Sequence, residues 1–207
     1  MDDAILTPIV DLLDLAGVAI FALSGALLAA KERQTFVTMA FFALFTGVGG
    51  GTVRDLLIDA PVFWMTDPWV APVCLGIALL AWFVPTRWYD GKLLDYADGL
   101  GLTAYAVLGA VKALSYGIPP VPAFLMGIIT GCAGGIVRDV IGGKPSIIMR
   151  PELYVTAAAL SAALAVAGTL AELPRWIVWG GATASGFALR SLAIRFGLSL
   201  PAYGRKS

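Results

Sequence analysis

Seven apolar stretches occupy most of this chain and constrain its fold more than any other feature. A membrane-spanning helix needs about 20 mostly apolar residues, and the connections between these stretches are too short for a soluble domain. The stretches are continuous and do not alternate with a period of two, which favours helices over a barrel. The sequence therefore predicts an all-α integral membrane protein with a single membrane domain over residues 1–207. The predicted spans are Val10–Ala30, Thr35–Leu57, Trp69–Val84, Leu93–Leu114, Val121–Ile141, Leu153–Leu170 and Trp176–Leu198.

The composition excludes several other classes of protein. Of the 207 residues, 59% are hydrophobic, which leaves too few polar residues for the surface of a soluble domain. Fourteen Lys and Arg balance fourteen Asp and Glu, so the basic excess of a nucleic-acid-binding protein is absent. Histidine is also absent, which rules out a Ser/His/Asp triad and a His-ligated metal. We expect no enzyme activity, no cofactor or metal, and no nucleic-acid partner.

Basic residues recur in every second connection and predict the orientation. The basic connections and the tail contain Lys31, Arg33, Arg87, Lys92, Lys144, Arg150, Arg205 and Lys206, and Arg175 is the one clear exception. Cytoplasmic loops of membrane proteins are enriched in Lys and Arg. We therefore expect seven crossings, with the N-terminus outside and the C-terminus in the cytoplasm. Six or eight spans would break the alternation.

The two halves of the chain superpose without gaps over roughly fifty residues after a shift of 84 positions, by which Asp14 falls on Asp98. The most specific match sets Gly50–Asp55 (Gly-Gly-Thr-Val-Arg-Asp) on Gly134–Asp139 (Gly-Gly-Ile-Val-Arg-Asp). Each copy holds three spans, an odd number, so the second copy enters the membrane from the opposite side as an inverted repeat. We expect repeats at residues 10–84 and 93–170, with the seventh helix, 176–198, outside the duplication. The alternative is that duplication only produced a stable bundle.

Clusters of glycine lie in the second and fifth spans, before each Arg-Asp pair. Adjacent glycines cost about 1 kcal/mol each relative to Ala in a helix, so we expect both helices to be broken there. Carbonyl groups freed by a break suit a cation, and the hydroxyls of Thr46 and Thr130 would add oxygens. The alternative is that the glycines only permit close helix packing.

Charges within a membrane span are rare and often functional. Adjacent residues of a helix do not face each other, so each arginine of the repeated motif needs a partner elsewhere. The hypothesis is two buried charge pairs related by inversion, which would leave Asp55 and Asp139 free to face an aqueous path. These pairs are Arg54 with Asp14 and Arg138 with Asp98. The alternative is that the arginines extend to lipid headgroups.

Three further cations lie within or at the ends of spans. Arg190 and Arg195 in the last span are expected to extend toward the cytoplasmic headgroups. Lys112, at the end of the fourth span, is expected either to extend outward or to lie at a pore mouth.

At the doubled Gly-Gly-x-Val-Arg-Asp motif, the chain resembles the prokaryotic trimeric intracellular cation (TRIC) channels, which belong to a bacterial family also known as glycine-transporter-domain membrane proteins. The resemblance covers the whole chain and implies a homotrimer in the bacterial inner membrane. It further implies a pore in each subunit between kinked second and fifth helices, selective for monovalent cations, chiefly potassium, with sodium as a second ion. The pore-lining residues implied are Thr46, Gly49, Gly50, Gly51, Asp55, Thr130, Gly134, Gly135 and Asp139. Animal members carry a lipid-binding Lys-Glu-Val motif near the fourth span. Here the nearest stretch is Lys112–Leu114, and it departs from that motif.

Two functions remain open at this point. The first is a potassium-permeable channel, which the short loops favour. The second is a secondary carrier of a small amino acid such as glycine, because inverted repeats with broken helices suit carriers as well. An intramembrane hydrolase is a weak third candidate, because no base accompanies Ser24.

Overall fold

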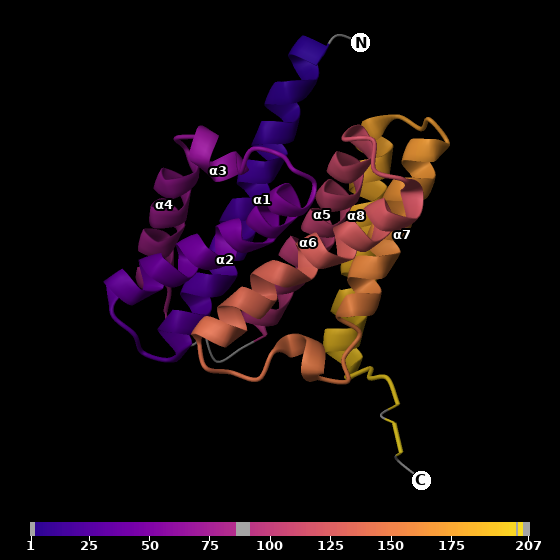
Figure 1. Cartoon of the computed structure of the whole chain (residues 1–207). Helices are drawn as coiled ribbons and strands as arrows, with labels where there is room; N and C mark the ends of the chain where they lie inside the picture. The colour runs from indigo at the N-terminus through magenta and orange to yellow at the C-terminus, as the bar shows by residue number, and fades with distance from the viewer. Residues whose placement is uncertain (1–2, 86–91, 202, 205–207) are drawn as a thin grey trace.

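The computed structural model describes residues 3–85, 92–201 and 203–204, with side chains from residue 14 onward in the first helix. Over these residues the chain forms eight α-helices and one short 3₁₀ helix (Figure 1). They are α1 (Asp3–Lys31), α2 (Phe36–Leu57), α3 (Phe63–Thr66), α4 (Val70–Trp82), α5 (Leu93–Ser115), α6 (Pro120–Ile141), η2 (Ile147–Met149), α7 (Val155–Leu170) and α8 (Arg175–Phe196).

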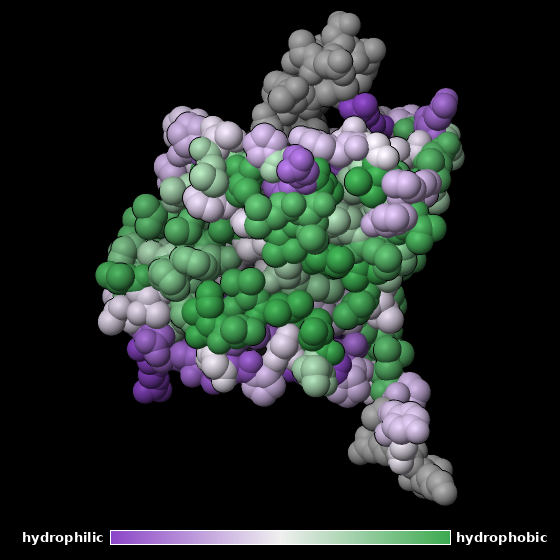
Figure 2. Space-filling model, viewed as in Figure 1, coloured by the Kyte–Doolittle hydropathy of each residue, from purple (hydrophilic) through white to green (hydrophobic). Residues whose placement is uncertain are grey.

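A helix lies at each of the seven apolar stretches. Within the described part, α1, α2, α5, α6 and α8 are long and apolar enough to cross a membrane. The helices α4 and α7 are also apolar but contain only 13 and 16 residues. At 1.5 Å per residue they span roughly 20 and 24 Å, less than the ~30 Å hydrocarbon core. The space-filling view shows an apolar belt between two polar bands, as expected for a protein surrounded by lipid (Figure 2).

Four segments that are distant in sequence meet at one end of the bundle, which we call the basic end. Lys144 after α6 pairs with Glu32 after α1 at 2.9 Å. Lys92, before α5, donates to the carbonyl oxygen of Ile194 near the end of α8. The segment before α7 bonds the chain after α8 through Leu200 N and Pro151 O. The exposed cations among the described residues near this end are Lys31, Arg33, Lys92, Lys144, Arg150 and Arg195. The N-terminal end of α1 lies at the opposite end of the bundle from the chain after α8 (Figure 1).

The helix α5 lies at the centre of the fold and packs against α1, α6, α7 and α8. In the first half, α1, α2 and α4 pack against one another, and in the second half α5, α6 and α7 do so. The helix α8 lies against α5 and α7. The two halves meet where α2 packs against α6. We call this contact the α2–α6 seam.

The expected breaks in the second and fifth helices are absent, so this prediction was wrong. Both α2 and α6 run as uninterrupted α-helices through their glycine clusters. The glycines instead allow the two helices to approach closely. A Cβ atom on Gly50 would collide with the backbone carbonyl oxygen of Thr130, and one on Gly134 would lie 3.1 Å from that of Thr46. Dense packing of the two helices offsets the low helix propensity of glycine.

Contacts between the halves recur at the 84-residue shift found in the sequence. The rings of Phe21 and Tyr105, which the shift superposes, meet edge to face with centroids 5.2 Å apart. Phe21 lies over Gly101, and Tyr105 lies over Gly17. Equivalent residues therefore contact each other at the centre of the molecule.

Candidate functional site

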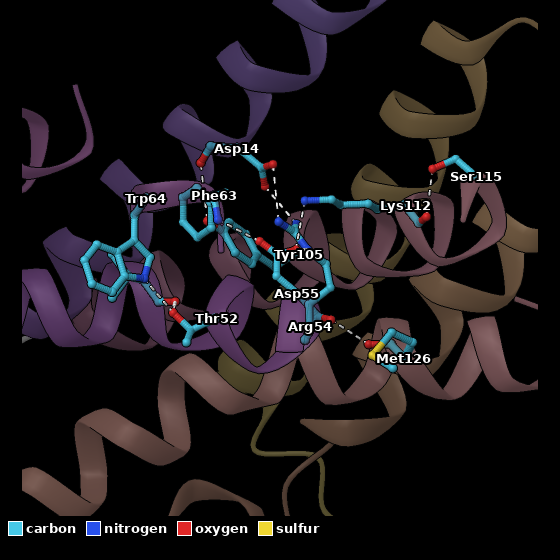
Figure 3. Close-up of polar contacts among 12 residues, drawn as sticks. Asp14, Thr52, Arg54, Asp55, Phe63, Trp64, Tyr105, Lys112, Ser115 and Met126 are labelled. Carbon is cyan, nitrogen blue, oxygen red and sulfur yellow. Dashed lines mark hydrogen bonds and ion pairs between the residues drawn. The ribbon is translucent and has the colours of Figure 1, made fainter. Parts of the chain in front are cut away.

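The first charge cluster consists of Asp14, Arg54, Asp55 and Lys112 and lies at the end of the α2–α6 seam away from the basic end (Figure 3). Arg54 is fully buried near the end of α2. Its Nη1 and Nη2 atoms donate to Asp14 Oδ1 and Oδ2 at 2.9 and 3.4 Å. This two-point contact joins α2 to α1 in a geometry that suits a guanidinium and a carboxylate.

Asp55 is also buried, and its two oxygens accept three further bonds. Arg54 Nε donates to Oδ1 at 2.8 Å, and Lys112 Nζ on α5 donates to the same oxygen at 2.8 Å. The backbone N–H of Phe63 donates to Oδ2 at 3.0 Å. The expectation that adjacent Arg and Asp residues cannot pair was wrong, because the flexible arginine side chain bends back to its neighbour. Asp55 is therefore not free to face an aqueous path.

The short helix α3 covers this end of α2. The ring of Phe63 lies against Gly51, and its centroid is 5.7 Å from the Arg54 guanidinium carbon. Trp64 Nε1 donates to Thr52 Oγ1 at 2.9 Å (Figure 3). The connection after α2 is thus fixed to the charged motif by an aromatic contact and two hydrogen bonds.

The second charge cluster consists of Asp98, Arg138 and Asp139 and lies at the other end of the seam, near the basic end. Arg138 Nη1 lies 2.5 Å from Asp98 Oδ1 and 3.3 Å from Ser24 Oγ. Its Nε and Nη2 atoms donate to Asp139 Oδ1 at 3.0 and 2.8 Å. The backbone N–H of Ile147 donates to Asp139 Oδ2 at 2.7 Å. The bonds from arginine Nε, from arginine Nη1 to the distant aspartate, and from the backbone N–H repeat the first cluster at a shift of 84 positions. The Nη2 bond differs, because Arg54 directs Nη2 to Asp14 whereas Arg138 directs it to Asp139.

The structure brings together the two arginine–aspartate pairs that the sequence suggested, and it excludes extension of these arginines to headgroups. Arg54 and Arg138 are 0% and 2% exposed. Asp139, like Asp55, is engaged by its neighbouring arginine rather than free. Arg190 was expected to extend to the cytoplasmic headgroups, but it is fully buried, and its Nη2 atom lies 2.7 Å from Glu152 Oε2. Pairing with a carboxylate compensates the buried guanidinium charge, so the side chain does not have to reach the headgroup region.

Of the remaining predicted site residues, some contact each other across the tightly packed α2–α6 seam, namely Thr46, Gly49, Gly50, Thr130 and Gly134. Gly51 instead lies against Phe63, and Gly135 lies against Tyr154. Thr46 and Thr130 are fully buried. Thr130 Oγ1 donates to the carbonyl oxygen of Met126, whereas Thr46 Oγ1 has no hydrogen-bond partner among the described residues. A Cβ atom on Gly49 would lie 3.4 Å from Val137. The hydroxyl groups of Thr46 and Thr130 lie against Gly25 of α1 and Gly109 of α5, and the helices of the seam are in contact.

Sequence reasoning missed Phe63 and Ile147, which supply backbone N–H groups to Asp55 and Asp139. Neither residue has a chemically distinctive side chain. The signal that could have identified them is the duplication itself, because each lies eight positions after its aspartate and the pair obeys the 84-residue shift.

A cavity of about 460 Å³ lies away from the seam, between α5, α7 and α8. Its walls include Leu108, Leu173 and Trp179, and its polar lining includes Lys112 and Glu172. Lys112 thus lies between this cavity and the first charge cluster, while its ammonium group bonds Asp55.

Comparison of the sequence with known families matches residues 11–86 and 95–169 to the family described as "Glycine transporter". The two matched segments correspond to the two halves of the chain. A UPF0126 membrane protein of Vibrio cholerae is 33% identical over 208 residues, covering 98% of this chain and 86% of the relative. The UPF0126 inner membrane protein YadS of Escherichia coli K12 is 38% identical over 148 residues, covering 70% of this chain and 72% of the relative.

Similar solved structures are TRIC channels. The TRIC trimeric intracellular cation channel orthologue from Rhodobacter sphaeroides is 38% identical, has a TM-score of 0.84, and is matched over 99% of its chain and 92% of this one. A second prokaryotic TRIC channel is 26% identical, with a TM-score of 0.85 over all of its chain and 94% of this one.

Proposed function

The chain belongs to the glycine transporter family of bacterial membrane proteins, which includes the prokaryotic TRIC channels, and from this membership we propose that it is a monovalent-cation channel. The carrying observation is its likeness to the Rhodobacter sphaeroides TRIC channel, at 38% identity over 99% of that chain. We propose potassium as the principal ion, with sodium as a second permeant ion. The assembly is a homotrimer in the bacterial inner membrane.

The proposed architecture has seven crossings and two inverted three-helix repeats. This architecture is supported by two equivalent ion pairs, Arg54 with Asp14 and Arg138 with Asp98, which lie at opposite ends of the α2–α6 seam. The positions of α1 and the chain after α8 at opposite ends of the bundle fit an odd number of crossings. The basic end faces the cytoplasm, because cytoplasmic ends of membrane proteins are enriched in Lys and Arg.

The proposed pore follows the α2–α6 seam. Its oxygens come from Thr46, Thr130 and the backbone at the glycine clusters, and a charge cluster lies at each end. The packed seam corresponds to a closed state, and conduction requires α2 and α6 to separate. The backbone carbonyl oxygens of Thr46 and Thr130 support this path, because they lie where α2 and α6 meet, against Gly134 and Gly50. Carbonyl oxygens lining a cavity suit a cation.

Single-channel recording of the purified protein in a planar bilayer tests this function. Discrete potassium currents, with smaller sodium currents and no chloride current, are expected. Saturable glycine flux into liposomes without unitary currents would instead identify a carrier. Arg195→Lys, which retains the charge of an exposed residue near the end of α8, provides a matched control for the reconstitution. Native mass spectrometry of the same preparation tests the trimer.

A further inference from the structure

The two charge clusters are related by the 84-residue shift. The hydrogen bonds and charges of one cluster can therefore be compared directly with those of the other. In the first cluster all four carboxylate oxygens accept a bond. Asp14 binds Arg54 through both oxygens, and Asp55 binds Arg54 and Lys112 through one oxygen and the Phe63 N–H through the other. Two cations there balance two anions.

The second cluster has one carboxylate oxygen without a partner. Asp98 Oδ1 and both oxygens of Asp139 accept bonds, but Asp98 Oδ2 accepts none from any described residue. Asp98 is 1% exposed, so bulk water does not satisfy this oxygen. A buried carboxylate oxygen left unpaired is costly.

The second cluster also has one positive charge fewer. The 84-residue shift places Leu28 at the position equivalent to Lys112, so one arginine faces two aspartates. Charges on the elements packed nearby do not make up the difference. Two of them, Arg190 and Arg150, both pair with Glu152, and Asp95 adds a second negative charge three residues before Asp98 on α5.

A second difference places an additional oxygen beside Asp98. The shift places Tyr154 at the position equivalent to Val70. Tyr154 is 1% exposed, and its hydroxyl lies against Gly135, as does Asp98 Oδ1. No hydrogen bond of ordinary geometry joins Tyr154 Oη to a described residue. The half that lacks the lysine thus contributes a hydroxyl group.

We propose that Asp98 Oδ2 and Tyr154 Oη hold a monovalent cation that replaces, in the second cluster, the charge that Lys112 provides in the first. The inference rests on the proposed cation channel and specifies a binding site within it. A carboxylate and a hydroxyl are hard oxygen ligands that suit an alkali-metal ion. The excess of a single negative charge matches one monovalent ion, whereas a divalent ion would need more carboxylates and six or more oxygens.

The test is cation-dependent stability of the purified full-length protein, measured without transport. The melting temperature is followed while KCl replaces N-methyl-D-glucamine chloride at constant ionic strength, and NaCl is titrated separately. A saturable rise is expected, because an ion that binds the folded state stabilises it. Tyr154→Phe removes one oxygen and retains the ring, so half-saturation should require about tenfold more potassium. Tyr105→Phe is the matched control, because it removes an equally buried hydroxyl that lies at the first cluster, where it donates to the carbonyl oxygen of Asp14, and it should leave the titration unchanged.

A gain-of-charge variant provides an independent test. Leu28→Lys places an ammonium group at the position equivalent to Lys112 and should abolish the potassium dependence while the protein remains folded. A wild-type melting temperature that is unaffected by potassium would overturn the proposal. An equal titration of Tyr154→Phe and Tyr105→Phe, or an unchanged potassium dependence of Leu28→Lys, would do the same. Potassium currents without saturable binding would refute the site but not the channel, and binding without currents would refute the channel but not the site.

Discussion

Gly50 lies against the backbone carbonyl oxygen of Thr130, so close that no side chain fits between them. Backbone atoms cannot move aside as the end of a flexible side chain can. The contact therefore fixes the separation of α2 and α6 along the seam.

Gly50→Ala should destabilise the closed protein by about 1–3 kcal/mol through overpacking. Gly49→Ala is its matched control, because the new Cβ would lie in ordinary contact, 3.4 Å from Val137. The control should stabilise the helix by up to about 1 kcal/mol. Melting temperatures in detergent give the order, with Gly49→Ala at or above wild type and Gly50→Ala below it. The opposite order would contradict the close approach.

The Arg54–Asp14 pair should show strong energetic coupling. Removing one partner of a buried pair costs about 3–5 kcal/mol, because a buried charge is left uncompensated. A double-mutant cycle with Arg54→Gln and Asp14→Asn should therefore give a coupling energy of at least about 2 kcal/mol. The half-exposed Lys144–Glu32 pair should give less than about 1 kcal/mol in the same assay. Equal coupling energies in the two cycles would contradict the prediction that burial strengthens the Arg54–Asp14 pair.

Lys112→Gln should raise potassium conductance. Removing one positive charge changes the potential energy of a cation that lies about 10 Å away in water by about 0.4 kcal/mol, which corresponds to a roughly twofold change in local cation concentration. The effect should disappear near 1 M KCl, where the Debye length falls to about 3 Å. Arg195→Gln on α8 should have no comparable effect. An increase that is independent of salt would indicate a structural rather than an electrostatic cause.

Asp55→Ala should release the connection after α2, because the carboxylate no longer accepts the N–H of Phe63. Hydrogen exchange at that amide should accelerate about tenfold or more, corresponding to the loss of one hydrogen bond to a charged group. Arg54 keeps its bonds to Asp14, so the helix end should stay in place. Exchange over the same peptide in Glu172→Gln serves as the control and should match wild type.

The two ends of the bundle should face opposite sides of the membrane. Cysteine variants at Gln34, near the basic end, and at Glu172, at the opposite end, occupy exposed connections. The native Cys74 and Cys132 are buried and should not react. An impermeant maleimide should label Glu172→Cys in intact spheroplasts and Gln34→Cys only after lysis. Labelling of both before lysis would contradict the orientation.

The sequence predicted the helices well, because the length of apolar runs reflects a physical requirement of the membrane. For example, α2 was expected over Thr35–Leu57 and runs over Phe36–Leu57, with Thr35 as its N-cap. The sequence also suggested both long-range arginine–aspartate pairs, because a duplicated chain repeats its contacts.

Two features could not be predicted because they depend on packing between segments. The glycine clusters favour broken helices by local propensity, but the approach of Thr130 to Gly50 outweighs that preference. Side-chain spacing on a helix did not indicate that Arg54 would bend back to Asp55, because a buried guanidinium with several donors is best satisfied by two carboxylates.

The edge-to-face contact between Phe21 and Tyr105 has an evolutionary consequence. Equivalent positions of the two repeats share one space, so a larger residue in one half must be matched by a smaller residue in the other. The halves can diverge freely at their lipid-facing surfaces but must co-evolve along the line where they meet. Sequence covariation in this family should therefore be concentrated at the Phe21–Tyr105 pair and at the two glycines that these rings cover, Gly101 and Gly17.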